Sequence, residues 1–442
     1  MRIPTFKIAA LAPILLLLAG VGRAQDLDLI LSSFRSDIDP DATGQTFGTH
    51  MAADGIWAVV SGTDTTIPDG TLGAVYLYRF DNGWVFEKRL ETPPEPDTPR
   101  RVGWDVAIDG EWIAVSIQNT GVALYRRDQG GPENWGFHSR VVEDDNTQFR
   151  ERDASLTVAL DGDTLIVGAP LTDYGPFTAD TNQVGSVLVY GLVGNDWQLS
   201  QLITIPAADQ ERIAGFGGSV KVLGNLLAVG SPTYSFAGLG SPGQVWVYQR
   251  NTATSDFTLF DTLRSDAPVD NGRFGVSLGL SATTLAVGSP NGAGDLTPLA
   301  TNDGSIYIFE PSLTGYDLMD ELVPSTPEFL NGFAADLAIE GDLLWSADEA
   351  AGFLFRRSTQ GQWAEIDRNS APDFPPPQTV RQFGTSVAFT REGTRLHGIV
   401  GDRIAELLLP DPNNPGMDRL TRVGAAFFYL FDDGLFADSF ED

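Results

Sequence analysis

The stretch Gly185-Ser-Val-Leu-Val-Tyr190 is one of seven copies of a short phrase, a glycine followed by an alternating apolar run that ends near an aromatic residue. Successive copies begin 48 to 72 residues apart. A period of this size indicates a repeat architecture, in which each copy belongs to one structural unit. The copies begin at Gly73, Gly121, Gly185, Gly243, Gly304, Gly352 and Gly424.

Each copy of the phrase lies inside a longer unit of four predicted strands. The unit opens with Phe-Gly or a related pair, as at Phe216-Gly217, and an alternating strand follows. A tight turn such as Asp161-Gly162 leads to a second, more apolar strand, because Asp and Gly tolerate the positive φ of short hairpins. The glycine-led phrase is the third strand, and an aromatic such as Trp197 marks the fourth. Four short antiparallel strands, repeated, predict the blades of a β-propeller.

The seventh unit lacks an obvious fourth strand after Tyr429. The segment Asp26–Asp37 resembles the fourth strand of unit four, Asp256–Asp266. We therefore expect the N-terminal strand to pair with the last blade, which closes the ring and removes an exposed sheet edge. The predicted fold class is all-β, a seven-bladed β-propeller of four-stranded antiparallel blades. An open solenoid is the alternative architecture.

The Phe-Gly pair and a Gly-Ala-Pro or Gly-Ser-Pro triplet after the second strand resemble FG-GAP repeats. The resemblance implies the seven-bladed propeller of integrin α-subunits and of many bacterial secreted proteins, here over residues 25–431. The triplet is present in units three to five, at Gly168-Ala169-Pro170, Gly230-Ser231-Pro232 and Gly288-Ser289-Pro290.

The calcium loop of many FG-GAP repeats, Asp-x-Asn-x-Asp-Gly between the first two strands, is missing from this chain. Only a tight turn joins those strands, and Asp161-Gly162-Asp163 offers two carboxylates where calcium takes six to eight oxygens. The loop residues Asp295, Asn302 and Asp303 could bind an ion weakly, and solvation of the loop is the alternative explanation of their polarity. We therefore assign no metal site and no cofactor.

The N-terminus has the features of a targeting segment. Arg2 and Lys7 precede the apolar run Ile8–Val21, and Gly22-Arg23-Ala24 places small residues at the cleavage positions. Residues 1–24 are therefore predicted to be a cleaved secretory signal peptide, and a membrane anchor is the alternative. We expect a secreted, periplasmic or cell-surface protein without a membrane span in the mature chain. Residues 432–442 form a short tail, similar to an ending seen on exported proteins of some proteobacteria.

Composition narrows the possible chemistry. The chain has no cysteine, which rules out disulfides, thiolate zinc sites and a cysteine nucleophile. It carries 28 basic and 59 acidic residues, for a net charge of −31. Such a charge repels nucleic acid and anionic membranes. We expect a monomer whose partner is not a nucleic acid.

The fourth position of every opening strand is polar, and the next position is apolar. Period-two alternation places these two sets on opposite faces of the strand. The polar set should line the central channel, because the opening strand should be the innermost of its blade. Its members are His50, Asp105, Thr157, Ser219, Ser277, Asp336 and Ser386.

Three members of this channel set, His50, Asp105 and Asp336, depart from the serine that the resemblance implies. His50 and Asp105 belong to adjacent units, so we predict a hydrogen bond between them that raises the pKa of the histidine. The alternative is a structural role, in which polar side chains satisfy backbone groups near the axis.

The connections between second and third strands should emerge on one face, and they are long in units one, three, four, five and seven. Long loops on a rigid scaffold are where binding sites concentrate. Aromatic side chains dominate contact energies, so the candidate ligand-binding residues are exposed loop aromatics. The alternative is that these aromatics fold over the blade tops. The candidates are Tyr174, Phe177, Tyr234 and Phe236.

The sequence favours an exported, non-enzymatic binding or adhesion module that recognises a protein or a glycan through this loop face. The three histidines lie in different units, and no HExxH segment is present. We therefore assign no catalytic residue. The alternatives are a hydrolase or lyase with a channel site around His50, Asp105 and Asp336, and a structural component of the envelope.

Overall fold

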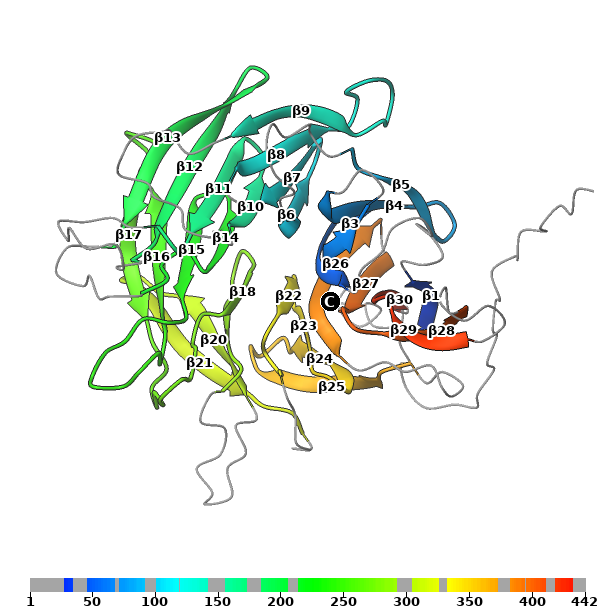
Figure 1. Ribbon diagram of the computed structural model, residues 1–442. Helices are drawn as coiled ribbons and strands as arrows, with labels where there is room; N and C mark the ends of the chain where they lie inside the picture. The colour runs from blue at the N-terminus through cyan, green and yellow to red at the C-terminus, as the bar shows by residue number, and fades with distance from the viewer. Residues whose placement is uncertain are drawn as a thin grey trace, which may run out of the picture.

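The structure is a computed structural model, and its regular secondary structure consists of β-strands in the residues that it describes. Seven four-stranded antiparallel sheets surround a common centre (Figure 1). The seven-bladed β-propeller predicted from the repeats is thus confirmed. The described residues are 28–34, 46–67, 71–91, 101–118, 120–141, 156–172, 184–205, 214–291, 304–325, 332–372, 382–393, 395–410 and 418–431.

In the first six blades the four strands follow one another in chain order, from the centre outward. Blade 1 comprises β2 (Phe47–Asp54), β3 (Trp57–Thr66), β4 (Leu72–Phe80) and β5 (Trp84–Arg89). Blade 2 comprises β6 (Val102–Asp109), β7 (Trp112–Ile117), β8 (Gly121–Arg126) and β9 (Gly136–Val141). Blade 3 comprises β10 (Thr157–Asp161), β11 (Thr164–Ala169), β12 (Ser186–Val193) and β13 (Asp196–Thr204).

The next three blades repeat the same order. Blade 4 comprises β14 (Ser219–Leu223), β15 (Leu226–Ser231), β16 (Gln244–Arg250) and β17 (Phe257–Leu263). Blade 5 comprises β18 (Ser277–Leu280), β19 (Leu285–Ser289), β20 (Ser305–Pro311) and β21 (Tyr316–Leu322). Blade 6 comprises β22 (Leu337–Glu340), β23 (Leu343–Ala347), β24 (Ala351–Arg357) and β25 (Trp363–Ser370).

Blade 7 joins the two ends of the chain. Its order is β26 (Phe383–Glu392), β27 (Arg395–Asp402), β30 (Ala425–Phe431) and β1 (Asp28–Phe34). The N-terminal strand β1 pairs antiparallel with β30, with Ser33 opposite Ala426. The Ser33 hydroxyl also shares a 2.6 Å hydrogen bond with the Tyr78 hydroxyl of blade 1. The predicted closure of the ring is therefore confirmed.

The connection between β27 and β30 contains a hairpin that the sequence did not predict. Its strands are β28 (Glu406–Pro410) and β29 (Asp418–Arg422), which pair antiparallel. The long connection that we expected between the second and third strands of unit seven thus contains β28 and β29.

The glycine of the repeated phrase is required by the contact between blades. Gly243 ends the loop before β16 with φ +85°, and it bridges to Phe274 at the start of blade 5. A Cβ on Gly243 would overlap the carbonyl oxygen of Phe274 and lie 2.5 Å from its nitrogen. The corresponding bridge between Gly424 and Phe47 joins blade 7 to blade 1. Five of the seven phrase glycines pack against backbone that opens the next unit, whereas Gly352 lies against the Trp345 side chain of its own blade.

The opening phenylalanine completes this junction. Phe274 is fully buried, and its ring lies 5.3 Å from that of Tyr307 on β20 of its own blade. Phe216 lies in the same way 5.3 Å from Trp246, nearly perpendicular to it. Such edge-to-face pairs add stability beyond the area that they bury. The Phe-Gly pair thus fixes the start of a blade both to the preceding blade and to its own third strand.

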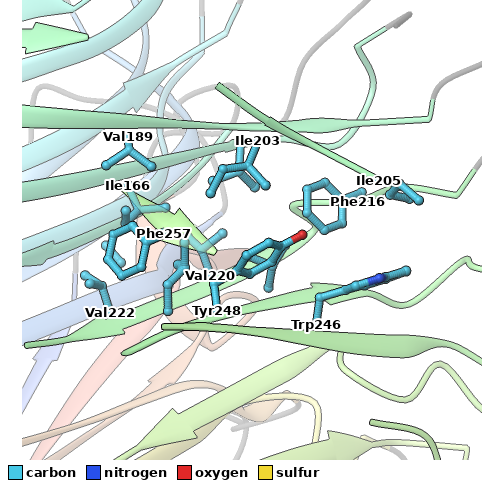
Figure 2. Close-up of a cluster of buried hydrophobic side chains, with 14 of the residues drawn as sticks. Ile166, Val189, Ile203, Ile205, Phe216, Val220, Val222, Trp246, Tyr248 and Phe257 are labelled. Carbon is cyan, nitrogen blue, oxygen red and sulfur yellow. The ribbon is translucent and has the colours of Figure 1, made fainter. Parts of the chain in front are cut away.

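The apolar core is divided into seven clusters among the described residues, each between two consecutive blades. Figure 2 shows the cluster between blades 3 and 4, where Ile166 and Val189 face Val220 and Phe257. Each cluster is completed only by its neighbouring blade, so the blades depend on one another for burial. One cluster joins blades 7 and 1, through Phe428 and Tyr78.

The predicted signal peptide and the C-terminal tail lie outside the described residues. No helix suited to crossing a membrane is present in the described part of the chain.

Candidate functional site

The innermost strands of all seven blades line a central channel with a cavity of about 410 Å³. Every member of the predicted polar set belongs to this lining, together with apolar neighbours on the same strands. Figure 1 shows the strands β6, β10, β14, β18 and β22 converging on this centre. The channel set is His50, Asp105, Thr157, Ser219, Ser277, Asp336 and Ser386.

Three hydroxyl members of this set tie their blade to the next one. Thr157 donates to Gly217 O at 2.8 Å, Ser219 to Gly275 O at 2.6 Å, and Ser277 to Ala334 O at 2.7 Å. Each acceptor belongs to the opening pair of the following unit. The hydroxyl protons are thus used between blades, which leaves oxygen lone pairs as the groups that these side chains can offer to the channel.

The two carboxylates also link their blade to the next one, but they accept hydrogen bonds from backbone N–H groups instead of donating to carbonyls. Asp105 accepts hydrogen bonds from Val106 N at 2.9 Å and from Val158 N of blade 3 at 2.8 Å. Asp336 accepts from Leu337 N and from Val387 N of blade 7, both at 2.9 Å. The structural role weighed for these residues is therefore present in the geometry.

The surroundings of the two carboxylates make their ionised forms costly. Burial raises the pKa of Asp105 to about 6, although the Val158 N–H and the charge of Lys221 both lower it. Burial also raises the pKa of Asp336, although the charge of Lys221 lowers it there too. The two carboxylates lie on blades 2 and 6, and the charge of Lys221 on blade 4 lowers the pKa of both.

The predicted pair of His50 and Asp105 is wrong. No hydrogen bond joins them among the described residues, because both carboxylate oxygens of Asp105 point at backbone N–H groups. Burial lowers the pKa of His50 to about 4, opposed by Asp336 and assisted by Arg403. The histidine is therefore neutral near pH 7 and is not the charged partner that the sequence suggested.

The turn aspartates at the other end of the inner strands form a second series of links between blades. Asp54 accepts from Gly110 N at 2.8 Å, Asp109 from Gly162 N at 2.8 Å, and Asp161 from Gly224 N at 2.6 Å. Each aspartate thus reaches the turn glycine of the next blade. In the described residues, no group of three or more His, Asp or Glu side chains is placed to hold a metal ion.

One residue of the channel breaks the sevenfold pattern. Two residues after the polar set, six blades place alanine or glycine in the lining, and blade 4 places Lys221. The Lys221 side chain is exposed, and no residue that the structure describes forms an ion pair or hydrogen bond with its ammonium group. The small residues of this ring are Ala52, Ala107, Ala159, Gly279, Ala338 and Ala388.

Trp104 is a second exception in the channel. Eight of the nine tryptophans are buried, and Trp104 is partly exposed and belongs to the cavity lining. It stands one position before Asp105, where blades 4 and 6 have Gly218 and Ala335. Lys221 and Trp104 were missed from the sequence, and a comparison of equivalent positions across all units is the signal that finds them.

The loop face is described in full at blade 4. The connection from β15 to β16, residues 232–243, is hydrogen-bonded to the connection between blades 4 and 5, residues 264–276. Asn271 N donates to Gly240 O at 2.7 Å, and Gly240 N donates to Asp270 Oδ1 at 2.6 Å. Phe274 N donates to Pro242 O at 2.9 Å. We call these two connections the blade-4 platform.

The platform concentrates backbone conformations that L-residues rarely adopt. Four of its non-glycine residues have positive φ, namely Ala237, Ser241, Asn271 and Arg273, with φ of 52° to 57°. Asparagine tolerates this region, but alanine, serine and arginine do so at a cost. Such strain persists only where the surroundings enforce it, and it clusters at functional sites.

The predicted aromatic anchors of this face require a correction. Tyr234 is only 4% exposed, because its ring packs into the core 5.2 Å from that of Trp246. Phe236 is partly buried, with the Arg264 guanidinium 4.2 Å above its ring. The expected exposure of Tyr234 is thus wrong, and the alternative of aromatics folded over the blade holds for it. Tyr174 and Phe177 lie outside the described residues.

Comparison with known proteins supplies no family for this chain. No protein-family model and no curated protein matches it. The crystal structure of Saccharomyces cerevisiae Sqt1 is similar at 11% identity and a TM-score of 0.45, over 87% of this chain and 96% of that chain. A chain from the S. cerevisiae complex of Dbp5 with Nup159 and Gle1 is similar at 11% identity and a TM-score of 0.48, over 92% and 96%. The FG-GAP resemblance therefore stays a prediction.

Proposed function

We propose that the protein is an exported, non-enzymatic binding module that recognises a protein or a glycan through the loop face of its propeller. The observation that carries the proposal is the blade-4 platform. Its two connections are fixed by hydrogen bonds to each other, and it holds three residues other than asparagine or glycine in the left-handed region. A surface fixed before binding loses less conformational entropy in the complex.

The chemistry of the platform suits polar recognition. The side chains of Arg264 and Arg273 are exposed there, beside Asp266 and Asp270. Arg264 is oriented by the Phe236 ring and by a 2.5 Å hydrogen bond from its Nε to Gln244 Oε1. Arginine is enriched among residues that dominate binding energy, because its planar group binds carboxylates and stacks on flat surfaces.

The hydrogen bonds of the two channel carboxylates also support this proposal. Asp105 and Asp336 each accept one backbone N–H from the next residue of their own blade and one from the following blade. These contacts support a role of the two residues in joining the blades.

The test screens the purified mature protein on a glycan array and against a random peptide library displayed on phage. Ligands found in either screen are then titrated against the double variant Arg264→Ala, Arg273→Ala. We expect a loss of affinity of about tenfold or more for the double variant, the effect of removing charge-assisted contacts.

The matched control removes two arginines from the opposite face. Arg126 ends β8 at its hairpin with β9, and Arg395 begins β27 after the hairpin from β26. The variant Arg126→Ala, Arg395→Ala should bind as the wild type does. An equal loss in both double variants, or no ligand in either screen, would contradict the proposal.

A further inference from the structure

The central channel has the size and the mixed polarity of a small-ligand site. Its cavity of about 410 Å³ lies within the range of roughly 300–1,000 Å³ that such sites occupy. The space exists because the ring of Lys221 is otherwise made of alanine and glycine. These six small residues leave space in the channel around the single lysine side chain.

The Lys221 ammonium group is not accounted for by the scaffold. The nearby carboxylates of Asp105 and Asp336 are held by backbone N–H groups, not by the lysine. No residue in the described ranges forms an ion pair with Lys221. A cation without a direct partner, in a ring whose other members are alanine and glycine, is suited to an anionic group of a ligand.

The polar ring beside Lys221 offers acceptors. The hydroxyl protons of Thr157, Ser219 and Ser277 are donated to carbonyls of the next blade. A carboxylate has about four lone-pair positions. Asp105 uses two of them for backbone N–H groups, and Asp336 uses two for backbone N–H groups and one for the Ser386 side chain. A ligand that binds here must therefore bring hydrogen-bond donors for this ring and an anion for the lysine.

We propose that the channel binds a sugar acid of monosaccharide size, whose carboxylate pairs with Lys221 and whose hydroxyl groups donate to Asp105 and Asp336. The partly exposed Trp104 in the lining supplies an aromatic surface for the sugar ring. This site is separate from the blade-4 platform and goes beyond the proposed function. Neither result of its test decides whether the loop face binds a macromolecule.

The experiment titrates the purified mature protein with D-glucuronate and D-galacturonate by isothermal calorimetry. D-glucose and acetate serve as probes that carry only the hydroxyl groups or only the carboxylate. We expect one of the two uronates to bind at least about tenfold more tightly than glucose and than acetate, since a charge-assisted contact is worth that factor. Equal affinity for uronate and glucose, or no binding of either uronate, would overturn the proposal.

Variants locate the bound ligand. Lys221→Gln should weaken uronate binding about tenfold or more, and Lys221→Arg should retain most of it. Lys88→Gln makes the same change on the outer strand β5 and should bind as the wild type does. Trp104→Ala should also weaken binding, and its effect remains measurable if Lys221→Gln lowers the melting temperature. Undiminished uronate binding by Lys221→Gln would refute the assignment.

Discussion

The repeated glycine can be tested by one added methyl group in blade 4. Gly243→Ala places a Cβ where φ is +85°, at a cost of about 1–2 kcal/mol for an L-residue. The same Cβ would overlap Phe274 O and lie 2.5 Å from Phe274 N and 2.9 Å from Phe274 C. These atoms are backbone of the next blade and cannot turn away, so overpacking adds about 1–3 kcal/mol. We expect Gly243→Ala to lower the free energy of unfolding by about 2–5 kcal/mol in total.

Gly224→Ala is the matched control in the same blade. Gly224 has φ +56°, and no atom lies within 4 Å of an added Cβ. Its N–H, which donates to Asp161, is kept by alanine. The free energy of unfolding of this variant should therefore fall only by the cost of the positive φ, about 1–2 kcal/mol.

The assay is equilibrium unfolding in urea, followed by tryptophan fluorescence and by far-ultraviolet circular dichroism. Free energies are compared where the two probes give coincident transitions. If Gly243→Ala costs no more than Gly224→Ala, the contact between blades does not explain the repeated glycine.

Three further predictions follow from buried side chains. Tyr234→Ala should lower the free energy of unfolding by about 3–5 kcal/mol because the ring is in the core; an unchanged urea midpoint would show that the ring is dispensable. Asp105→Ala leaves the Val158 N–H without its acceptor and should cost about 1–3 kcal/mol, measured as a lower urea midpoint than that of the wild type. Burial lowers the pKa of His397 from 6.5 to about 4, so the unfolded chain takes up the proton first and stability falls as the pH drops from about 6.5 to 4. Between pH 7 and pH 5 the free energy of unfolding of His397→Leu should therefore fall by about 2 kcal/mol less than that of the wild type. Equal falls in the two proteins would contradict the lowered pKa of His397.

The architecture could be predicted because each blade repeats the residues that join it to the next. The third-strand glycine bridges to the opening phenylalanine of the next unit at Gly185 and Phe216, at Gly243 and Phe274, and at Gly424 and Phe47. Between blades 1 and 2 the bridge joins Leu72 to Arg101. The role of β1 was predictable for a similar reason, since the last unit lacked a strand that the N-terminus resembled.

The errors arose where a contact depends on distant parts of the chain. Tyr234 follows the triplet of unit four and looked like a loop residue, but the loop returns it to Trp246 on β16. The turn residues near Pro410 concealed the hairpin of β28 and β29. His50 and Asp105 are adjacent around the channel, but backbone N–H groups of blades 2 and 3 had already taken the carboxylate.

The candidate site was only partly visible for a different reason. The polar set followed from alternation along one strand. Lys221 and Trp104 become unusual only when the same position is compared in all blades. The blade-4 platform could not be predicted, because Ala237, Ser241 and Arg273 are not residues that favour positive φ.

The candidate channel site requires a closed ring, since the channel is lined by all seven blades. The chain has no cysteine, so a pair of introduced cysteines reports on closure without competing thiols. Ser33 of β1 lies opposite Ala426 of β30, and directly opposed positions in antiparallel strands have Cβ atoms about 4.5–5.5 Å apart.

The most direct measurement is therefore the disulfide yield of the variant Ser33→Cys, Ala426→Cys after mild oxidation, read by intact and peptide mass spectrometry. The closed propeller predicts a bond within one chain in most molecules. The control Ser33→Cys, Ala425→Cys moves one thiol to the other face of β30 and should form little of it. Absence of the 33–426 bond, or equal yields in the two variants, would contradict the closed ring.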